Sequence, residues 1–343
     1  PMKCTAATDC SSDLSSYFNV TELEAKIKEN VGFHQRGGNL KSVQNFLDKA
    51  IDPTLDKLGL KFIPDGEDKS ISSPTQYLRK HYDENPSPRK GYGEPLPGKY
   101  SNEKSKVLFE KRWFDVIEPR ERDNKWAASL GPVGPECKKT IQLGDKKGDG
   151  YKYICVPEES REDEECHVIS VGGNDNWKFE EAIVKQLGCT TYTFDCTLPD
   201  GKPKRKPNND KIKFFDYCID GNTYKDIQGR KYLTYEDMLQ VAGIHTPPTY
   251  FKIDVEGFEY DIFTQMMHTP DLLPTQIQVE LHWATRMTDL SWMQRTRSSG
   301  EIAMLTGMMF NAGSYLPVKL DFNAHCTSCM EVLYFRAPTC KSH

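Results

Sequence analysis

The amino-acid sequence predicts an α/β fold, a three-layer sandwich in which a mostly parallel sheet is covered by helices on both faces. The chain has 343 residues, so it holds one large domain with an extension or two domains. After about Gly131, short apolar runs alternate with helical repeats, which is typical of a parallel sheet with crossover helices. The connection between the last two apolar runs is too short for a crossover helix, so these two strands form an antiparallel hairpin.

The first half of the predicted sheet contains three strands and one helix. The strand at 167–172 is apolar and ends in glycine, and three good helix caps follow it: Asn174, Asp175 and Asn176. Apolar residues at every fourth position from Phe179 predict a helix that ends at Gly188. Two more strands follow, at 190–194 and 212–217.

The second half continues the alternation of helices and strands. Thr234-Tyr-Glu-Asp237 is typical of a capping box and predicts the start of a helix. A strand at 250–253 precedes a helix that begins near Phe258, and a fifth strand begins at Gln276 and continues toward Trp283. A helix at 301–311 and strands at 315–320 and 331–335 complete the domain.

The first 130 residues carry weaker signals. Helical spacing occurs at 21–30 and again at 39–60, where Pro53 interrupts it. The stretch from Lys69 to Ser101 is rich in Ser, Pro and Gly, so it is either an extended segment packed over another domain or a linker. We therefore divide the chain into an irregular, partly helical extension at 1–130 and a main domain at 131–343. The extension is a candidate surface for a protein partner.

Composition excludes several classes of protein. The mean hydropathy is −0.66, and no stretch has the roughly 18 uninterrupted apolar residues of a membrane helix. The net charge of −5 gives no overall attraction to nucleic acid. Eleven cysteines favour a secreted protein or one in the secretory pathway, the Golgi lumen included, over a cytosolic one with buried thiols. Because the number is odd, at least one thiol stays unpaired or pairs between chains. The sequon Asn19-Val20-Thr21 fits a glycoprotein.

Two features predict a cofactor site. Gly172, Gly173, Asn174 and Asn176 lie in the turn after the first strand, where a doubly wound fold brings backbone against a nucleotide-like ligand. Asp195 ends the second strand about twenty residues later, where a carboxylate can accept both ribose hydroxyls of an adenosine. A purely structural turn with a capping aspartate is the alternative.

The most distinctive segment is Phe251-Lys-Ile-Asp-Val-Glu-Gly-Phe-Glu259, paired downstream with Gln278-Val-Glu-Leu-His-Trp283. It resembles the hallmark of FkbM-type O-methyltransferases. Other segments look closer to the animal methyltransferase-like protein 24 branch of that family: Val168-Ile-Ser-Val-Gly172, Trp177-Lys-Phe-Glu180, Cys189, Tyr192-Thr-Phe-Asp195, Glu301-Ile-Ala with Gly313, Cys326-Thr-Ser-Cys329 and Val332-Leu-Tyr-Phe-Arg336.

The resemblance covers roughly residues 131–336. It implies a Rossmann-like class I methyltransferase domain that uses S-adenosylmethionine and acts on a hydroxyl of a sugar or another extracellular acceptor. The sequence departs from the common methyltransferase loop, which has an acid and three spaced glycines, because Ser170, Gly172, Asn174 and Asn176 stand at those places. Asn tolerates left-handed backbone, so the turn survives, and the relaxed loop is also compatible with a non-catalytic member of the family.

The catalytic candidates lie at two strand ends. Methyl transfer to oxygen needs an aligned acceptor and often a base that removes the hydroxyl proton. Asp254 and Glu256 follow the fourth strand, and Glu280 and His282 share one side of the fifth if that strand continues so far. The alternatives are a first-turn residue favoured by the helix dipole for Glu256 and a buried, satisfied histidine for His282. The cluster could also hold a divalent cation, but no fixed ligand spacing supports one.

The remaining cysteine and charge patterns leave alternatives open. Cys326 and Cys329 could be redox-active, bind zinc or form a disulfide, and a structural disulfide is favoured because the chain has no second CxxC pair. Cys137 and Cys155 are a second candidate pair. The basic loop 202–213 either attracts an acidic polysaccharide or is a solvated loop between strands.

These observations predict an S-adenosylmethionine-dependent O-methyltransferase of the secretory pathway with a small-molecule or glycan acceptor. The alternative is a secreted, disulfide-stabilised structural or interaction protein on a non-catalytic methyltransferase scaffold. A nicotinamide oxidoreductase is disfavoured by the terminal hairpin.

Overall fold

The computed structural model confirms the α/β fold. The structure describes residues 14–35, 130–144, 151–158, 166–226, 228–283, 297, 299–321 and 329–337. The helix predicted at 39–60, the Ser/Pro/Gly-rich segment at 69–101 and Cys326 lie outside these residues.

The central sheet has seven strands: β3 (His167–Val171), β4 (Thr190–Phe194), β5 (Ile212–Phe215), β9 (Tyr250–Ile253), β10 (Gln276–His282), β11 (Tyr315–Asp321) and β12 (Cys329–Arg336). Their order in space is β11-β12-β10-β9-β3-β4-β5. The five strands from β10 to β5 are parallel, whereas β12 is antiparallel to both β10 and β11. The predicted parallel sheet with a C-terminal antiparallel pair is therefore confirmed.

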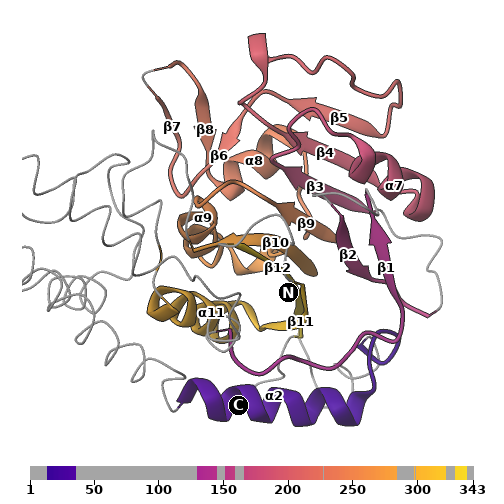
Figure 1. Cartoon of the computed structure of the whole chain (residues 1–343), viewed down its shortest axis with the longest axis vertical. Helices are drawn as coiled ribbons and strands as arrows, with labels where there is room; N and C mark the ends of the chain where they lie inside the picture. Colours follow the sequence, from indigo (N-terminus) through magenta and orange to yellow (C-terminus); the bar gives the residue numbers. More distant parts are fainter. Residues whose placement is uncertain are drawn as a thin grey trace, which may run out of the picture.

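Helices and a hairpin cover the two faces of this sheet (Figure 1). One buried cluster joins the sheet to α8 (Tyr235–Ala242), α9 (Glu259–Met266) and α11 (Ser299–Gly313). A second cluster on the opposite face joins it to α7 (Lys178–Leu187), to α2 (Val20–Gln35) and to the hairpin β1 (Thr140–Leu143) and β2 (Lys152–Cys155). Alternate strand residues divide between the clusters, as Val168 and Ile169 do, so both faces are buried.

The helix boundaries mostly follow the sequence, with one correction. Thr234 caps α8 by accepting a hydrogen bond from the backbone N–H of Asp237 at 3.2 Å, as predicted. The N-cap position of α7 is Trp177 rather than Asn174, Asp175 or Asn176, and its side chain makes no cap hydrogen bond. Asn176 still caps the helix start, because its side-chain oxygen accepts a hydrogen bond from the N–H of Lys178 at 3.3 Å. Asn174 and Asp175 have φ angles of 45° and 57°, so they form a left-handed turn before the helix begins.

Two small sheets were not predicted. The hairpin β1–β2 is attached to the central sheet by the side chain of Gln276, which exchanges two hydrogen bonds with the Cys155 backbone at 2.8 and 2.9 Å. Strands β6 (Cys218–Ile219), β7 (Tyr224–Lys225) and β8 (Lys231–Leu233) form a three-stranded sheet beyond β5. Two short 3-10 turns, η1 (Pro199–Gly201) and η2 (Pro270–Leu272), complete the described elements.

The N-terminal helix α2 includes the segment 21–30 for which a helix was predicted, and it packs on the main domain. Before it, Phe18 lies edge-on against Phe335 of β12 with ring centroids 4.7 Å apart. The amide of Asn30 donates a hydrogen bond to the Pro132 carbonyl at 3.1 Å. The exposed Asn19 of the sequon caps the helix through its side-chain oxygen. Within the described part of the chain, no helix is long and apolar enough to span a bilayer.

Every cysteine that the structure describes is disulfide-bonded. The predicted pair Cys137–Cys155 is confirmed, and two pairs that were not predicted join Cys166 to Cys189 and Cys196 to Cys218. The left-over thiol is therefore not among the described cysteines.

Candidate functional site

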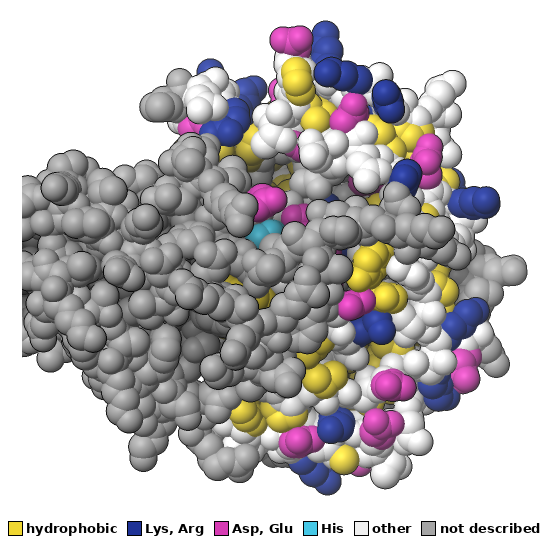
Figure 2. Space-filling model, in the orientation of Figure 1, with side chains coloured by type: hydrophobic (Ala, Val, Ile, Leu, Met, Phe, Trp, Pro, Cys, Tyr) yellow, Lys and Arg dark blue, Asp and Glu magenta, His cyan; other side chains and the backbone are white. Residues whose placement is uncertain are grey.

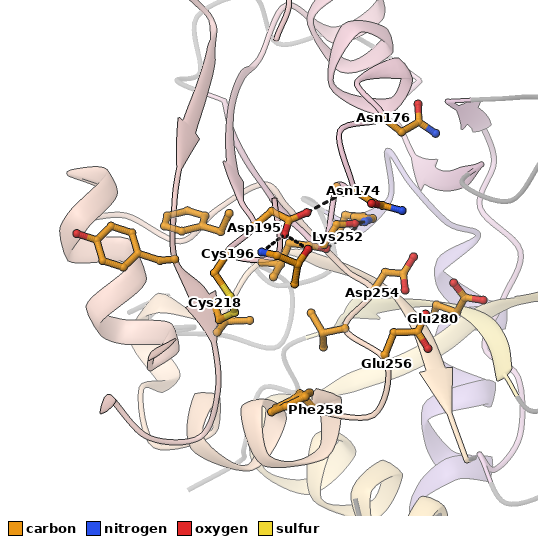
Figure 3. A pocket seen from close by; sticks show the side chains of 18 of the residues that line it. Asn174, Asn176, Asp195, Cys196, Cys218, Lys252, Asp254, Glu256, Phe258 and Glu280 are labelled. Atoms are coloured by element: carbon orange, nitrogen blue, oxygen red, sulfur yellow. Dashed lines mark hydrogen bonds between the residues drawn. A yellow bond between two sulfur atoms is a disulfide. The ribbon is translucent and has the colours of Figure 1, made fainter. Parts of the chain in front are cut away.

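A cleft of about 630 Å³ opens at the carboxyl ends of β3, β4, β9 and β10, within the size range of small-molecule sites. All nine candidate residues from the sequence line it: Gly172, Gly173, Asn174, Asn176, Asp195, Asp254, Glu256, Glu280 and His282. Figure 3 shows two groups of side chains, with Asn174 and Asp195 on one side and Asp254, Glu256 and Glu280 on the other. We call these sides the turn half and the acid half of the cleft.

The turn half begins with Gly172, where the backbone of β3 meets that of β9. Gly172 has a φ of +76°, and a Cβ atom on it would lie 1.8 Å from the carbonyl oxygen of Asp254. Only glycine fits so close to this backbone. The ammonium group of Lys252, on β9, donates hydrogen bonds to the carbonyls of Val171 at 3.0 Å and Gly172 at 2.6 Å. A buried lysine thus holds the turn from the neighbouring strand.

Asp195 fixes the far side of the same turn. Its Oδ2 accepts a hydrogen bond from the Asn174 N–H at 2.7 Å, and its Oδ1 accepts from the N–H and hydroxyl of Thr197 at 2.8 and 2.6 Å. A carboxylate has about four acceptor positions, so roughly one remains for a ligand hydroxyl without rearrangement. The backbone cradle and this carboxylate fit the ribose of an adenosine cofactor, with one direct hydrogen bond in place of the two expected.

The acid half is built around a buried ammonium group. Lys152, on β2, has no exposed surface and is hydrogen-bonded to Glu331 of β12. Its Nζ lies 3.7 Å from Asp254 Oδ2 and 3.9 Å from Glu280 Oε2. Burial opposes the charge on Lys152, but these three carboxylates together raise the pKa of its ammonium group. It stays charged and anchors the cluster.

The two carboxyl groups beside Lys152 have opposite pKa shifts. Burial disfavours the charge of Asp254, but Lys152, Lys252 and His282 outweigh it and lower its pKa to about 2. Burial and the neighbouring charge of Asp254 raise the pKa of Glu280 to about 8. Because Glu280 also hydrogen-bonds to Asp254, the two form a carboxyl–carboxylate pair that holds one proton at neutral pH.

His282 lies between two glutamates. Its Nδ1 is 2.7 Å from Oε1 of the buried Glu259, and its Nε2 is 3.6 Å from Oε2 of Glu256. Burial opposes the charge of the imidazole, but Glu259 and then Glu280 and Asp254 raise its pKa to about 10. The interpretation of His282 as a merely satisfied buried histidine is incomplete, because the ring also lines the cleft.

Glu256 is not a first-turn residue of α9, which begins at Glu259. It has a φ of +55°, a conformation that costs a non-glycine residue about 1–2 kcal/mol. Its side chain is 56% exposed and faces the other carboxylates (Figure 3). Backbone strain at a residue that lines a cleft is typical of functional sites.

The sequence analysis missed three residues that position the site: Lys152, Lys252 and Glu259. Lys252 carried a usable signal, since a lysine inside a buried strand needs a partner. The cleft wall beside Asp195 was missed too, and it includes Cys196, Tyr217, Cys218, Ile219, Arg230 and Tyr232. All but Cys196 follow β5 in the chain, and three of them, Cys218, Ile219 and Tyr232, lie on the small sheet that was not predicted.

Comparisons with known proteins agree with this geometry. A family model described as a methyltransferase domain matches residues 97–336, more than two thirds of the chain. The search of curated proteins finds no match. Among solved structures, the methyltransferase FkbM from Methylobacillus flagellatus KT is 14% identical, with a TM-score of 0.35, over 50% of this chain and 43% of that one. The pyocyanin biosynthetic protein PhzM is 11% identical, with a TM-score of 0.28, over 51% of this chain and 52% of that one.

A third similar structure, LepI in complex with SAM, is 10% identical with a TM-score of 0.31 and covers 93% of this chain and 69% of that one. The match spans only about half the length of FkbM and of PhzM. At these identities and TM-scores the solved structures add nothing to the family match. The family match is itself sufficient, because the matched residues include β3 to β12 and every residue of the cleft. The chain therefore belongs to the methyltransferase-domain family, and its cofactor is S-adenosylmethionine.

Proposed function

We propose that the protein transfers a methyl group from S-adenosylmethionine to a hydroxyl of a carbohydrate or another acceptor in the secretory pathway. One observation carries the proposal. The turn half of the cleft combines a backbone turn with a carboxylate, which suits an adenosine cofactor. The acid half beside it combines several carboxyl groups with a histidine, which suits the hydroxyl group of an acceptor. Methyl transfer needs the cofactor and the acceptor side by side, and the two halves of the cleft would provide this.

The turn half would hold the cofactor. Backbone at Gly172 and Gly173 would approach it closely, Asp195 would accept a hydrogen bond from a ribose hydroxyl, and the wall at Tyr217 and Ile219 would receive the base. When bound, S-adenosylmethionine supplies an electrophilic methyl group on a positively charged sulfur. Lys252, which also lines the cleft, keeps the turn in place through its two hydrogen bonds to backbone carbonyls.

The acid half would bind and deprotonate the acceptor. Carboxylates accept hydrogen bonds from hydroxyl groups, so Asp254 and Glu256 can orient one. Glu280 is the strongest base of the group in its ionised form, because its pKa of about 8 lies near neutral pH whereas that of Asp254 lies far below it. The proton of the hydroxyl would pass to the ionised Glu280 carboxylate, which becomes more populated as pH rises toward 8, as the oxygen acquires the methyl group.

The compartment and the subfamily are part of the proposal. Three disulfides among the described residues support an oxidising compartment. The exposed Asn19 is accessible for glycosylation. The motif resemblance to the animal methyltransferase-like protein 24 branch supports the same assignment. Basic side chains gather at the top of the face in Figure 2, over the loop before β5 and the β7–β8 hairpin, and would attract an acidic glycan.

Isothermal titration with S-adenosylhomocysteine tests the cofactor site. We expect one site per chain for the wild type and at least about 10-fold weaker binding for Asp195→Asn, which loses charged hydrogen bonds. Asp200→Asn, an exposed change in η1, is the matched control. If the folded wild type does not bind the ligand, the non-catalytic scaffold is the correct interpretation. Transfer of labelled methyl groups to a glycan panel then tests the acceptor class.

A further inference from the structure

The acid half of the cleft contains a set of ligand atoms for a divalent cation. Asp254, Glu256 and His282 each offer one ligand atom, and these atoms lie within 4.8 Å of one another. Ligands on opposite sides of a small divalent cation are about 4.2 Å apart, since each bond is about 2.1 Å long. Small side-chain rotations would therefore bring all three atoms to one ion.

His282 has the arrangement of a metal-binding histidine. The buried carboxylate of Glu259, 2.7 Å from Nδ1, fixes the orientation of the ring, as carboxylates behind metal-bound histidines do. The opposite atom, Nε2, lies 3.6 Å from Oε2 of Glu256, with which it forms an ion pair. The 95% buried ring thus directs its second nitrogen toward a carboxylate of the same candidate ligand set.

The local charge also favours a cation. The ammonium group of Lys152 faces three carboxylates, those of Glu331, Asp254 and Glu280. It carries one positive charge among them, and Glu256 adds a fourth carboxyl group at the mouth of the cleft. Carboxylate oxygens are ligands that hard divalent cations prefer. In Figure 2 a histidine and acidic side chains meet near the centre of the face, where an ion from solvent would enter.

A second set of ligand atoms lies close by but is less suitable. It consists of Glu280, His282 and Cys329. Cys329 is disulfide-bonded, so its sulfur cannot act as the thiolate that metals bind. The set with Asp254 and Glu256 keeps Glu280 available as the base.

We propose that Asp254, Glu256 and His282 bind one divalent cation, with Mn²⁺ the best match to two carboxylates and an imidazole, and that its open positions bind the acceptor hydroxyl. The inference rests on the proposed function, for which it supplies the means of acceptor activation. A bound cation makes the hydroxyl more acidic. The O–H proton passes to the ionised form of the Glu280 carboxyl group, the new O–CH₃ bond forms as the S–CH₃ bond breaks, and S-adenosylhomocysteine leaves.

The test is a Mn²⁺ titration of the full chain after chelator treatment, with unbound Mn²⁺ measured by electron paramagnetic resonance. We expect one site per chain, and affinity at least about 10-fold weaker in Glu256→Gln and His282→Gln. Glu259→Gln, which alters only the residue behind the histidine, should weaken binding by about 10- to 100-fold. Glu236→Gln and His268→Gln, both at exposed positions outside the cleft, are the controls and should bind Mn²⁺ as the wild type does.

Wild-type protein that does not bind Mn²⁺, or Glu256→Gln and His282→Gln proteins that bind it unchanged, would overturn the inference. Glu256 is half exposed, so its variant should fold even if His282→Gln does not, and circular dichroism checks both. S-adenosylhomocysteine titrations of the same samples separate the two proposals. Binding of that ligand without Mn²⁺ binding refutes the cation site alone, whereas Mn²⁺ binding without that ligand refutes the methyltransferase assignment and leaves the cation site.

Discussion

Replacing Gly172 with alanine tests whether the turn after β3 is the cofactor site. The new Cβ would lie 1.8 Å from the Asp254 carbonyl oxygen, against a minimum of 3.0 Å in real structures, so the two strand ends must separate by about 1.2 Å. The φ of +76° adds a conformational cost of about 1–2 kcal/mol for alanine. A displacement of about 1 Å in a ligand-positioning element can cost on the order of 100-fold.

A matched glycine separates the two costs. Gly243, the C-cap of α8, has a φ of +72° and nothing within 4 Å of a Cβ atom. Gly243→Ala should therefore lose only the conformational 1–2 kcal/mol, a fall in Tm of about 2–8 °C. Its affinity for S-adenosylhomocysteine should stay unchanged, because Gly243 does not line the cleft.

The assay is isothermal titration of both variants with S-adenosylhomocysteine, together with thermal unfolding. For Gly172→Ala we expect affinity about 10- to 100-fold below the wild type, and a larger fall in Tm than for Gly243→Ala. If Gly172→Ala binds within about threefold of the wild type, a difference below about 1 kcal/mol, the turn does not hold the cofactor.

Three further predictions concern the supports of the cleft. Lys252→Met removes two charge-assisted hydrogen bonds, each contributing about 1.5–3 kcal/mol, so titration should show weaker S-adenosylhomocysteine binding than in Lys211→Met, whose lysine bonds the Gly188 carbonyl outside the cleft. Replacing both cysteines of Cys196–Cys218 or of Cys166–Cys189 with serine should lower the free energy of unfolding by about 3 kcal/mol in each case, because the paired cysteines are 22 and 23 residues apart. Denaturant unfolding measures this. Only the loss of Cys196–Cys218, which lines the cleft, should also weaken cofactor binding. In the presence of a chelator, the free energy of unfolding should fall as pH rises from 4.5 to about 8, because of Glu280, and from 6.5 to about 10, because of His282. The reason is that a folded state with raised pKa values binds more protons than the unfolded state. Glu280→Gln should flatten the first range, and an unchanged slope would contradict the assignment of that range to Glu280.

The strands and the site residues at their ends could be predicted from the sequence because one physical rule connects them. Parallel strands end at one edge of the sheet, so Asp195, Asp254 and Glu280 had to approach one another once the strands were recognised. This rule could not predict that Lys152 belongs to the site. Its strand has four residues and, among the described strands, pairs with β1 alone, and a lysine there would ordinarily be exposed.

The disulfides mark a second limit of the sequence. Cys196 and Cys218 pair because β4 and β6 bring them together, and β6 has only two residues, too few for a periodic signal. Spacing alone could not choose this pairing among the many that eleven cysteines allow. The left-handed Asn174 could be anticipated, whereas its hydrogen bond to Asp195 depends on the spacing of β3 and β4.

Asp254 belongs to the acid half of the cleft and also contacts the turn half, so it connects the two halves. Its backbone N–H donates to the Val171 carbonyl at 3.3 Å, its carbonyl oxygen abuts Gly172, and its carboxylate lies 3.7 Å from the Lys152 ammonium. Lys252 holds the turn through its hydrogen bonds and acts on the Asp254 carboxylate through its charge. Any shift of the turn must therefore move the backbone that carries this carboxylate. In the proposed function, the strand pair β3–β9 would set the distance between cofactor and acceptor, so substitutions at Gly172 should impair methyl transfer even at saturating cofactor.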